Sequence, residues 1–267
     1  MDFIYYVLAI IIILSPVIAL VYPVIQKQQR ESGKKSRGAK VARLAKLSNT
    51  TMKTYFSQPV KDCATMETFY SMLDPTFCNV LEKLDKENGD LYIGELEWDV
   101  AVEKKRGRRR SIIDFAMELS SNSLDDRYIR VKHSATFCIL YDNGFKLPNF
   151  ELSKETLDKK ATELLRMNKT EDIDFQDDKE FSSAWWLTSN ENIIVRELFT
   201  KTIRSSFMKF VNKGYKICGQ SNFIFILTND IIQPDHYSEI MSDLRAIQRF
   251  LKTNKKFYTP YSEREQQ

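Results

Sequence analysis

The residues best suited to chemistry lie in one acidic run, residues 171–180, which reads EDIDFQDDKE and holds six carboxylates and one lysine. Asp172, Asp174 and Gln176 have the spacing with which a calcium loop begins, but the glycine and the distal glutamate of such a loop are missing. An Asp-x-Asp pair also suits a divalent metal used in phosphoryl or glycosyl transfer. A metal-dependent enzyme that uses Asp172 and Asp174 is therefore one alternative, although we favour a structural loop.

The same run is a candidate contact surface for a protein partner. Two adjacent tryptophans follow it, and such a pair commonly places one ring in the core and leaves the other accessible for stacking. The predicted partner-contact residues are Asp172, Asp174, Asp177, Asp178, Trp185 and Trp186.

Two basic runs carry the opposite charge. Lys104–Arg110 places six cations in seven residues, and residues 27–46 carry eight cations against the single Glu31. Clustered cations bind anionic lipid headgroups or the phosphates of nucleic acid, of which lipid is the favoured partner here. For Lys104–Arg110 a solvated loop that keeps a hairpin soluble is the favoured interpretation, and lipid and then nucleic acid are the alternatives. The predicted anionic-surface residues are Lys104, Lys105, Arg106, Arg108, Arg109, Arg110, Lys34, Lys35 and Arg37.

Signatures of other catalytic chemistry are absent from the sequence. The two histidines, His133 and His236, lie far apart, and neither is near a nucleophile motif. The four cysteines form no C-x-x-C pair, and no Walker, dinucleotide-binding or H-E-x-x-H motif occurs. We therefore expect no catalytic residues, no metal, no cofactor and a role that is not enzymatic.

The N-terminal run is the longest apolar segment, since Phe3–Ile25 is almost wholly apolar and no charge occurs before Lys27 apart from Asp2. As a helix it would extend roughly 35 Å, enough for the hydrocarbon core of a bilayer. The acidic start argues against a cleaved signal peptide. Because cations follow the run, the positive-inside rule predicts an outside N-terminus and a cytoplasmic C-terminal domain.

Hydrophobic periodicity predicts the remaining elements. Some segments have apolar residues at helical spacing, and others have apolar residues at every second position, as in strands. Asn, Asp, Gly and Pro mark the ends of these segments. The expected helices are 62–73, 75–87, 153–167, 190–212 and 234–252, and the expected strands are 96–102, 113–119, 128–132, 135–141, 215–218 and 223–228.

This order predicts an α+β fold, with an N-terminal transmembrane helix followed by a soluble domain that has an antiparallel sheet and flanking helices. The sequence is long enough for that domain to form a hydrophobic core without disulfides. The expected organisation is a transmembrane anchor at 1–26, a basic juxtamembrane stem at 27–60, a cytosolic α+β domain at 61–252 and a flexible tail at 253–267.

The second half of the chain also resembles a known family. It carries Leu147-Pro148-x-Phe150-x-Leu152, an Asp-Ile-Asp-Phe run at 172–175, Glu180-Phe181-Ser182 and Val195-Arg196-x-Leu198-Phe199. This LPxFxL…DIDF…EFS…VRxLF pattern is similar to that of a family of uncharacterised bacterial single-pass membrane-anchored proteins. The chain departs from the family at Cys218, where an acidic residue is expected before the glycine. The resemblance implies a bacterial inner-membrane location and a shared α+β domain, and it implies no activity.

Together these features predict a membrane-tethered cytoplasmic module that binds a protein partner or a membrane surface. Its expected partners are the bilayer, anionic lipids and a protein. A metal-dependent enzyme at Asp172 and Asp174, and nucleic-acid binding through Lys104–Arg110, are the alternatives.

Overall fold

The structure is a computed structural model, which describes residues 31–46, 50–53, 73–103, 128–155 and 171–264. These residues form two compact units. The first unit holds helical residues 31–43 and the distal ends of two strands, 101–103 and 128–131. The second unit holds the other described residues and contains the rest of the sheet and the candidate site.

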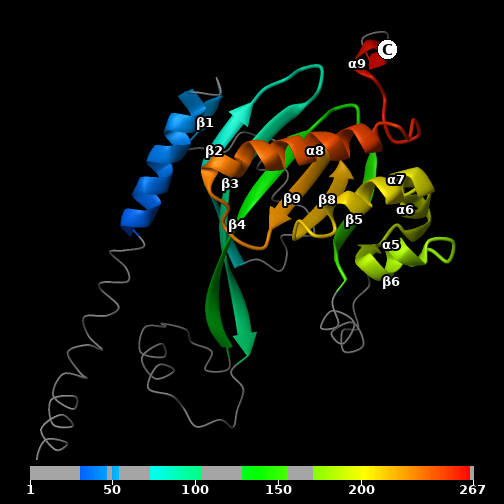
Figure 1. Ribbon diagram of the computed structural model, residues 1–267, viewed down its shortest axis with the longest axis horizontal. Helices are drawn as coiled ribbons and strands as arrows, with labels where there is room; N and C mark the ends of the chain where they lie inside the picture. The colour runs from blue at the N-terminus through cyan, green and yellow to red at the C-terminus, as the bar shows by residue number, and fades with distance from the viewer. Residues whose placement is uncertain (1–30, 47–49, 54–72, 104–127, 156–170, 265–267) are drawn as a thin grey trace, which may run out of the picture. The chain divides into compact units, whose positions relative to one another are not determined.

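Nine strands in the described part of the chain form one sheet, in the order β1-β2-β3-β4-β9-β8-β5-β7-β6 (Figure 1). The pairs β1–β2, β2–β3, β4–β9, β9–β8, β8–β5, β5–β7 and β7–β6 are antiparallel. The strands are β1 Thr51–Lys53, β2 Leu73–Lys83, β3 Asp90–Glu103, β4 Tyr128–Tyr141, β5 Leu147–Lys154, β6 Glu171–Asp172, β7 Trp185–Ser189, β8 Tyr215–Ser221 and β9 Phe223–Thr228.

Residues 31–46 are helical, and the labelled helices follow or connect the later strands. Three short ones, α5–α7, lie near β5 and β7, and α8 lies across one face of the sheet (Figure 1). The helices are α5 Lys179–Ala184, α6 Asn192–Leu198, α7 Lys201–Phe207, η2 Met208–Phe210, η3 Pro234–His236, α8 Tyr237–Leu251 and α9 Tyr261–Arg264.

The core centres on β9, all six residues of which are buried. Side chains alternate between the two faces of a strand, so both faces of the sheet are covered at this point. Phe225 pairs with Ile139 on β4, and Leu227 pairs with Phe137. These four side chains belong to one cluster of buried residues that also includes Phe77 and Leu96 from the other end of the sheet.

Polar contacts fasten α8 to two loops. Nη2 of Arg245 donates to the carbonyl of Gly89 at 2.8 Å, in the turn between β2 and β3. Nε2 of Gln248 donates to the buried carboxylate of Asp142 at 3.0 Å, and Lys252 lies 3.1 Å from the same carboxylate. The position of α8 is therefore set by directional contacts as well as by its apolar face.

One glycine of the sheet is required by close packing. The ring of Phe150 on β5 lies against Gly219 on β8, and a Cβ at Gly219 would come within 2.3 Å of that ring. Only a residue without a side chain leaves room for this contact.

The predicted membrane anchoring is corrected by the structure. No helix among the described residues is long and apolar enough to cross a bilayer. This finding contradicts the expected α+β fold with a transmembrane helix, the single-pass assignment and the inner-membrane location. The run on which the anchor was placed, residues 1–26, lies outside the described residues.

The predicted helix at 75–87 is also wrong, because residues 75–83 belong to strand β2 and the rest form a turn. Its pairing with β3 shifts between Cys78 and Leu81, where Asn79 takes a positive φ of 53°. A β-bulge of this kind breaks the period of two. Buried residues consequently fall at 77, 80 and 81, a spacing that imitates a helix.

The other element predictions have mixed outcomes. The hairpin at 215–228 is confirmed as β8 and β9, and the helix at 234–252 is confirmed as η3 and α8. The helix at 190–212 is divided into α6, α7 and η2, since Thr200 leaves helical geometry and caps α7. Residues 54–72, 104–127 and 156–170 lie outside the described residues. Nearly all of the predicted helix at 62–73, the strand at 113–119 and most of the helix at 153–167 fall in these ranges. The domain boundaries stay a prediction.

Candidate functional site

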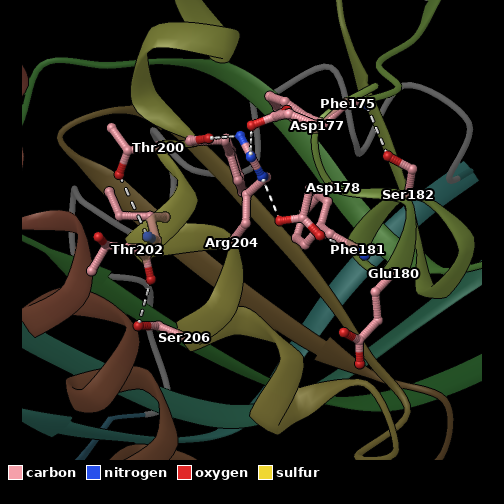
Figure 2. Close-up of polar contacts among 12 residues, drawn as sticks. Phe175, Asp177, Asp178, Glu180, Phe181, Ser182, Thr200, Thr202, Arg204 and Ser206 are labelled. Atoms are coloured by element: carbon pink, nitrogen blue, oxygen red, sulfur yellow. Dashed lines mark hydrogen bonds and ion pairs between the residues drawn. The ribbon is translucent and has the colours of Figure 1, made fainter.

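The acidic run folds around one buried arginine, Arg204 of α7, whose side chain is 4% exposed. Its Nε donates to Oδ2 of Asp178 at 2.9 Å, and its Nη2 donates to Oδ2 of Asp177 at 2.7 Å (Figure 2). Its Nη1 donates to the carbonyl of Phe199 at 3.0 Å. Hydrogen bonds between charged groups are about twice as strong as neutral ones. Arg204 therefore ties the acidic run to the junction of α6 and α7.

Local sequence explains why Arg204 points inward. Thr200 caps α7, its side chain accepting from the amide of Ile203. Ile203 and Phe207 place the apolar side of the helix in the core. Arg204 follows Ile203 by one residue and lies at the edge of that buried face, where a cation needs an acidic partner.

Residues 173–178, which we call the acidic loop, are held by their own hydrogen bonds. The amide of Phe175 donates to Oγ of Ser182 at 2.8 Å (Figure 2), and the amide of Ile173 donates to the carbonyl of Leu187 at 2.8 Å. Oδ1 of Asp178 accepts from the amide of Phe181 and so caps α5. The loop thus has a defined shape despite its charge.

Two opposing effects act on the Asp178 carboxyl. Burial raises its pKa, but the hydrogen bond from Arg204, the hydrogen bond from the Phe181 amide and the nearby charges of Arg204 and Lys201 lower it. The lowering effects are larger, so the pKa lies below its ordinary value of 3.8. Asp178 is therefore ionised at neutral pH and serves as a fixed partner of Arg204.

Phe175 lies beside two guanidinium groups. Cζ of Arg204 is 4.2 Å from the centroid of the Phe175 ring, and Cζ of Arg196 is 5.4 Å from it. The ring also meets Phe181 edge-on, with centroids 5.8 Å apart. These cation–π and aromatic contacts add to the ion pairs in fixing the loop.

Helix α6 forms the exposed part of the site. Nη1 of Arg196 donates to the carbonyl of Asp174 at 2.6 Å and joins the helix to the acidic loop. Val195 and Leu198 are buried below it, whereas Ile193 is 78% exposed and Ile194 is 40% exposed. We call residues 173–178 and 191–198 together the α6–acidic loop surface.

The structure brings together only some of the predicted site residues. Asp177 and Asp178 meet at Arg204, and Asp174 is exposed beside α6. Asp172 lies in the edge strand β6, opposite Thr188. Trp185 is buried in the core and Trp186 is half-buried.

The structure describes three of the predicted anionic-surface residues. Lys34 and Lys35 are exposed on the helix at 31–46, and Arg37 of that helix is half-buried. Lys104–Arg110 lies outside the described residues. Binding of an anionic surface stays a prediction for both groups.

Within the described ranges, no group of three or more His, Cys, Asp and Glu side chains is placed to hold a metal ion. Asp177 and Asp178 instead use carboxylate oxygens on Arg204. The acidic loop therefore uses its charge to bind an internal cation.

Sequence reasoning missed Arg204, Arg196 and Ile193. Arg204 is next to a predicted inner-face residue, and a cation at that position should have been assigned an acidic partner in the run at 171–180. Ile193 gave no such signal, because one exposed isoleucine in a helix is common.

Comparison with known proteins finds a solved structure of similar fold. No family model matches the chain, and no curated protein matches it. The crystal structure of the mycobacterial trehalose monomycolate transport factor A, TtfA, is similar, with a TM-score of 0.50 and 11% sequence identity. The match covers 85% of this chain and 98% of that chain. At this identity the likeness shows a shared fold and nothing of activity or partners.

Proposed function

We propose that this chain is a non-enzymatic module that binds a protein partner on its α6–acidic loop surface. The observation that carries the proposal is the adjacent pair Ile193 and Ile194, exposed on a short helix whose other side is fixed in the core.

The exposed pair supports binding because apolar surface gains free energy when a partner removes it from water. Among the described residues five large hydrophobic side chains are exposed, and Ile193 is the most exposed of them. Ile193 and Ile194 are also the only two of these five that are neighbours in sequence. The exposed charged residues Glu191, Arg196 and Glu197 lie next to them in the sequence, and an apolar centre with charged neighbours is the usual arrangement of an interface.

The rigidity of the surface supports the same proposal. Arg196 joins α6 to Asp174, and Arg204 holds Asp177 and Asp178. A surface that is already ordered loses less entropy when a partner binds, so more of the contact energy appears as affinity.

The acidic carboxylates favour binding over metal chemistry. Asp177 and Asp178 are engaged by Arg204, and Asp178 also caps α5. The structural neighbour is named a transport factor, a description that a binding module fits.

The test compares proteins that co-purify with the tagged full-length chain, with Ile193→Asp and with Leu84→Asp. Leu84 is a matched control, since it is 65% exposed and lies in the turn between β2 and β3. These two strands are far in the strand order from β5 and β7, which α6 contacts. We expect one protein to accompany the wild type and Leu84→Asp and to be lost from Ile193→Asp. An identical set of co-purifying proteins for all three would contradict the proposal.

A further inference from the structure

We infer that the segment bound by the α6–acidic loop surface is both apolar and basic, with aliphatic side chains flanked by lysine or arginine. This inference rests on the proposed function and names the chemistry of its partner.

The first argument is the sign of the exposed charge. Four carboxylates on this surface belong to exposed residues, at Asp174, Asp177, Glu191 and Glu197. Lys256 forms an ion pair with Glu197, and the amide of Asn149 donates to Glu191. Asp177 remains 66% exposed although Arg204 binds one of its oxygens. Arg196 is the one exposed cation among residues 173–178 and 191–198. Residues 173–178 and 191–198 hold five carboxylates, including that of Asp178, against Arg196 and the two ion-pair partners Arg204 and Lys256, so the balance of these charges is negative.

The second argument is that Arg196 is already occupied. Its Nε donates to Oδ1 of Asn192 at 2.9 Å, its Nη1 donates to the carbonyl of Asp174, and its guanidinium lies near the Phe175 ring. An incoming carboxylate would have to compete with these contacts. A cationic partner can instead approach the carboxylates without displacing any hydrogen bond of Arg196.

The third argument is the position of the carboxylates relative to the isoleucines. Residues three and four apart are neighbours on a helix surface, so Glu197 lies beside both Ile193 and Ile194. Arg196 lies beside Ile193 and carries the contact to the loop at Asp174. Lys256 balances the charge of Glu197, so the negative groups around the apolar pair are Glu191, three residues before Ile194, and Asp174 in the loop. A segment with cations flanking an aliphatic centre matches this order.

The same charges argue against anionic ligands at this place. A phosphate, a nucleic acid or an anionic lipid headgroup would meet the carboxylates of Asp174, Asp177 and Glu191, and like charges at an interface lower affinity. The partner chemistry is therefore that of a basic, apolar protein segment.

The experiment measures fluorescence anisotropy of three labelled twelve-residue peptides with the full-length chain. One peptide contains leucine and lysine, the second leucine and glutamate, and the third serine and lysine. We expect the leucine–lysine peptide to bind at least about tenfold more tightly than either of the others, since it alone has both features. Its affinity should fall as salt rises from about 0.05 to 0.3 M, because salt screens exposed charges.

Two variants locate the binding, each with a matched control. Ile193→Ser removes apolar surface without adding charge and should weaken binding about tenfold, whereas Leu84→Ser should not. Asp174→Asn removes a negative charge and keeps the backbone carbonyl of residue 174, which accepts the hydrogen bond from Arg196. This variant should weaken binding several-fold and reduce its salt dependence. Asp235→Asn, at an exposed position in η3, is its control.

The outcomes separate this inference from the proposed function. Equal or tighter binding of the leucine–glutamate peptide, no binding of any peptide, or no effect of Asp174→Asn would overturn the inference. The proposed function would still stand if Ile193→Asp loses its co-purifying protein. It would fail as well if the set of co-purifying proteins does not change.

Discussion

The guanidinium of Arg204 and the carboxylate of Asp178 join helix α7 to the first turn of α5 through a bond of 2.9 Å. Arg204 is 4% exposed and Asp178 is 18% exposed, so this ion pair is mostly shielded from water. It explains why a run of six carboxylates folds as an ordered loop.

Arg204→Met should lower the free energy of unfolding by about 1–3 kcal/mol, because Asp178 and the carbonyl of Phe199 lose a donor. The loss stays below that of a fully buried pair, since Asp177 is largely solvated. Urea unfolding measures the effect. Arg196→Met is the control, with a smaller expected loss because Arg196 is exposed. Equal stability of Arg204→Met and wild type would contradict the role given to Arg204.

Acid should weaken the same contact. The pKa of Asp178 is lower in the folded chain than its ordinary value of 3.8, so folding is stabilised where the carboxyl is ionised. This contribution is fully present above that value and is lost as pH falls through the lowered folded pKa. Asp178→Asn should be less stable than wild type at pH 6, and the difference should shrink towards pH 3. A constant difference across this range would show that ionisation of Asp178 is not involved.

Gly219→Ala should destabilise the chain by about 1–3 kcal/mol, because the added methyl would overlap the Phe150 ring. Gly219→Ala should lower the free energy of unfolding less when Phe150 is replaced by leucine than when Phe150 is present. A double-mutant cycle measures this difference. Gly33→Ala is the control, as nothing lies within 4 Å of the added atom. A strictly additive cycle would contradict the proposed clash.

Arg245→Met should loosen the turn between β2 and β3, since the carbonyls of Asn88 and Gly89 lose a shared donor. Faster amide hydrogen exchange around residues 84–91 is the expected result. Arg249→Met, on the exposed side of the same helix, should leave the exchange unchanged. Equal exchange in the two variants would show that Arg245 does not hold the turn.

Much of the second half of the chain follows from simple patterns. The buried stripe of α8, at Tyr237, Ile240, Leu244, Ile247 and Leu251, keeps a period near 3.6, and the β8–β9 hairpin has apolar strands on both sides of a turn. Local periodicity determines such elements, because each of them buries one continuous face.

The errors have equally local causes. The bulge at Asn79 gave strand β2 the spacing of a helix, and Thr200 divided a helical stripe whose residues Val195, Leu198, Phe199, Ile203 and Phe207 are all buried as expected. A hydrophobic pattern reports burial, and it does not report a single residue that leaves helical geometry.

The candidate site was only half predictable. The acidic run was identified, but its partner Arg204 lies 26 residues after Asp178, and no sequence period connects the two. The packing of α7 against the loop decides this pairing, and neither the composition of the sequence nor the spacing of its residues predicts that packing.

Ile193→Asp should leave the free energy of unfolding within about 0.5 kcal/mol of wild type, because the side chain is 78% exposed. Val195→Asp, two residues later and fully buried, should unfold the chain or lower its stability severely. Thermal and urea unfolding distinguish the two. A large loss for Ile193→Asp would mean that Ile193 stabilises the fold and is not reserved for a partner.

Site-specific photo-crosslinking tests the central claim most directly. A photoreactive phenylalanine replaces Ile193 in the full-length chain, and a second chain carries it at Leu84. The account predicts a discrete protein adduct from position 193 that is missing from position 84. No adduct at 193, or the same adducts at both positions, would contradict partner binding at the α6–acidic loop surface.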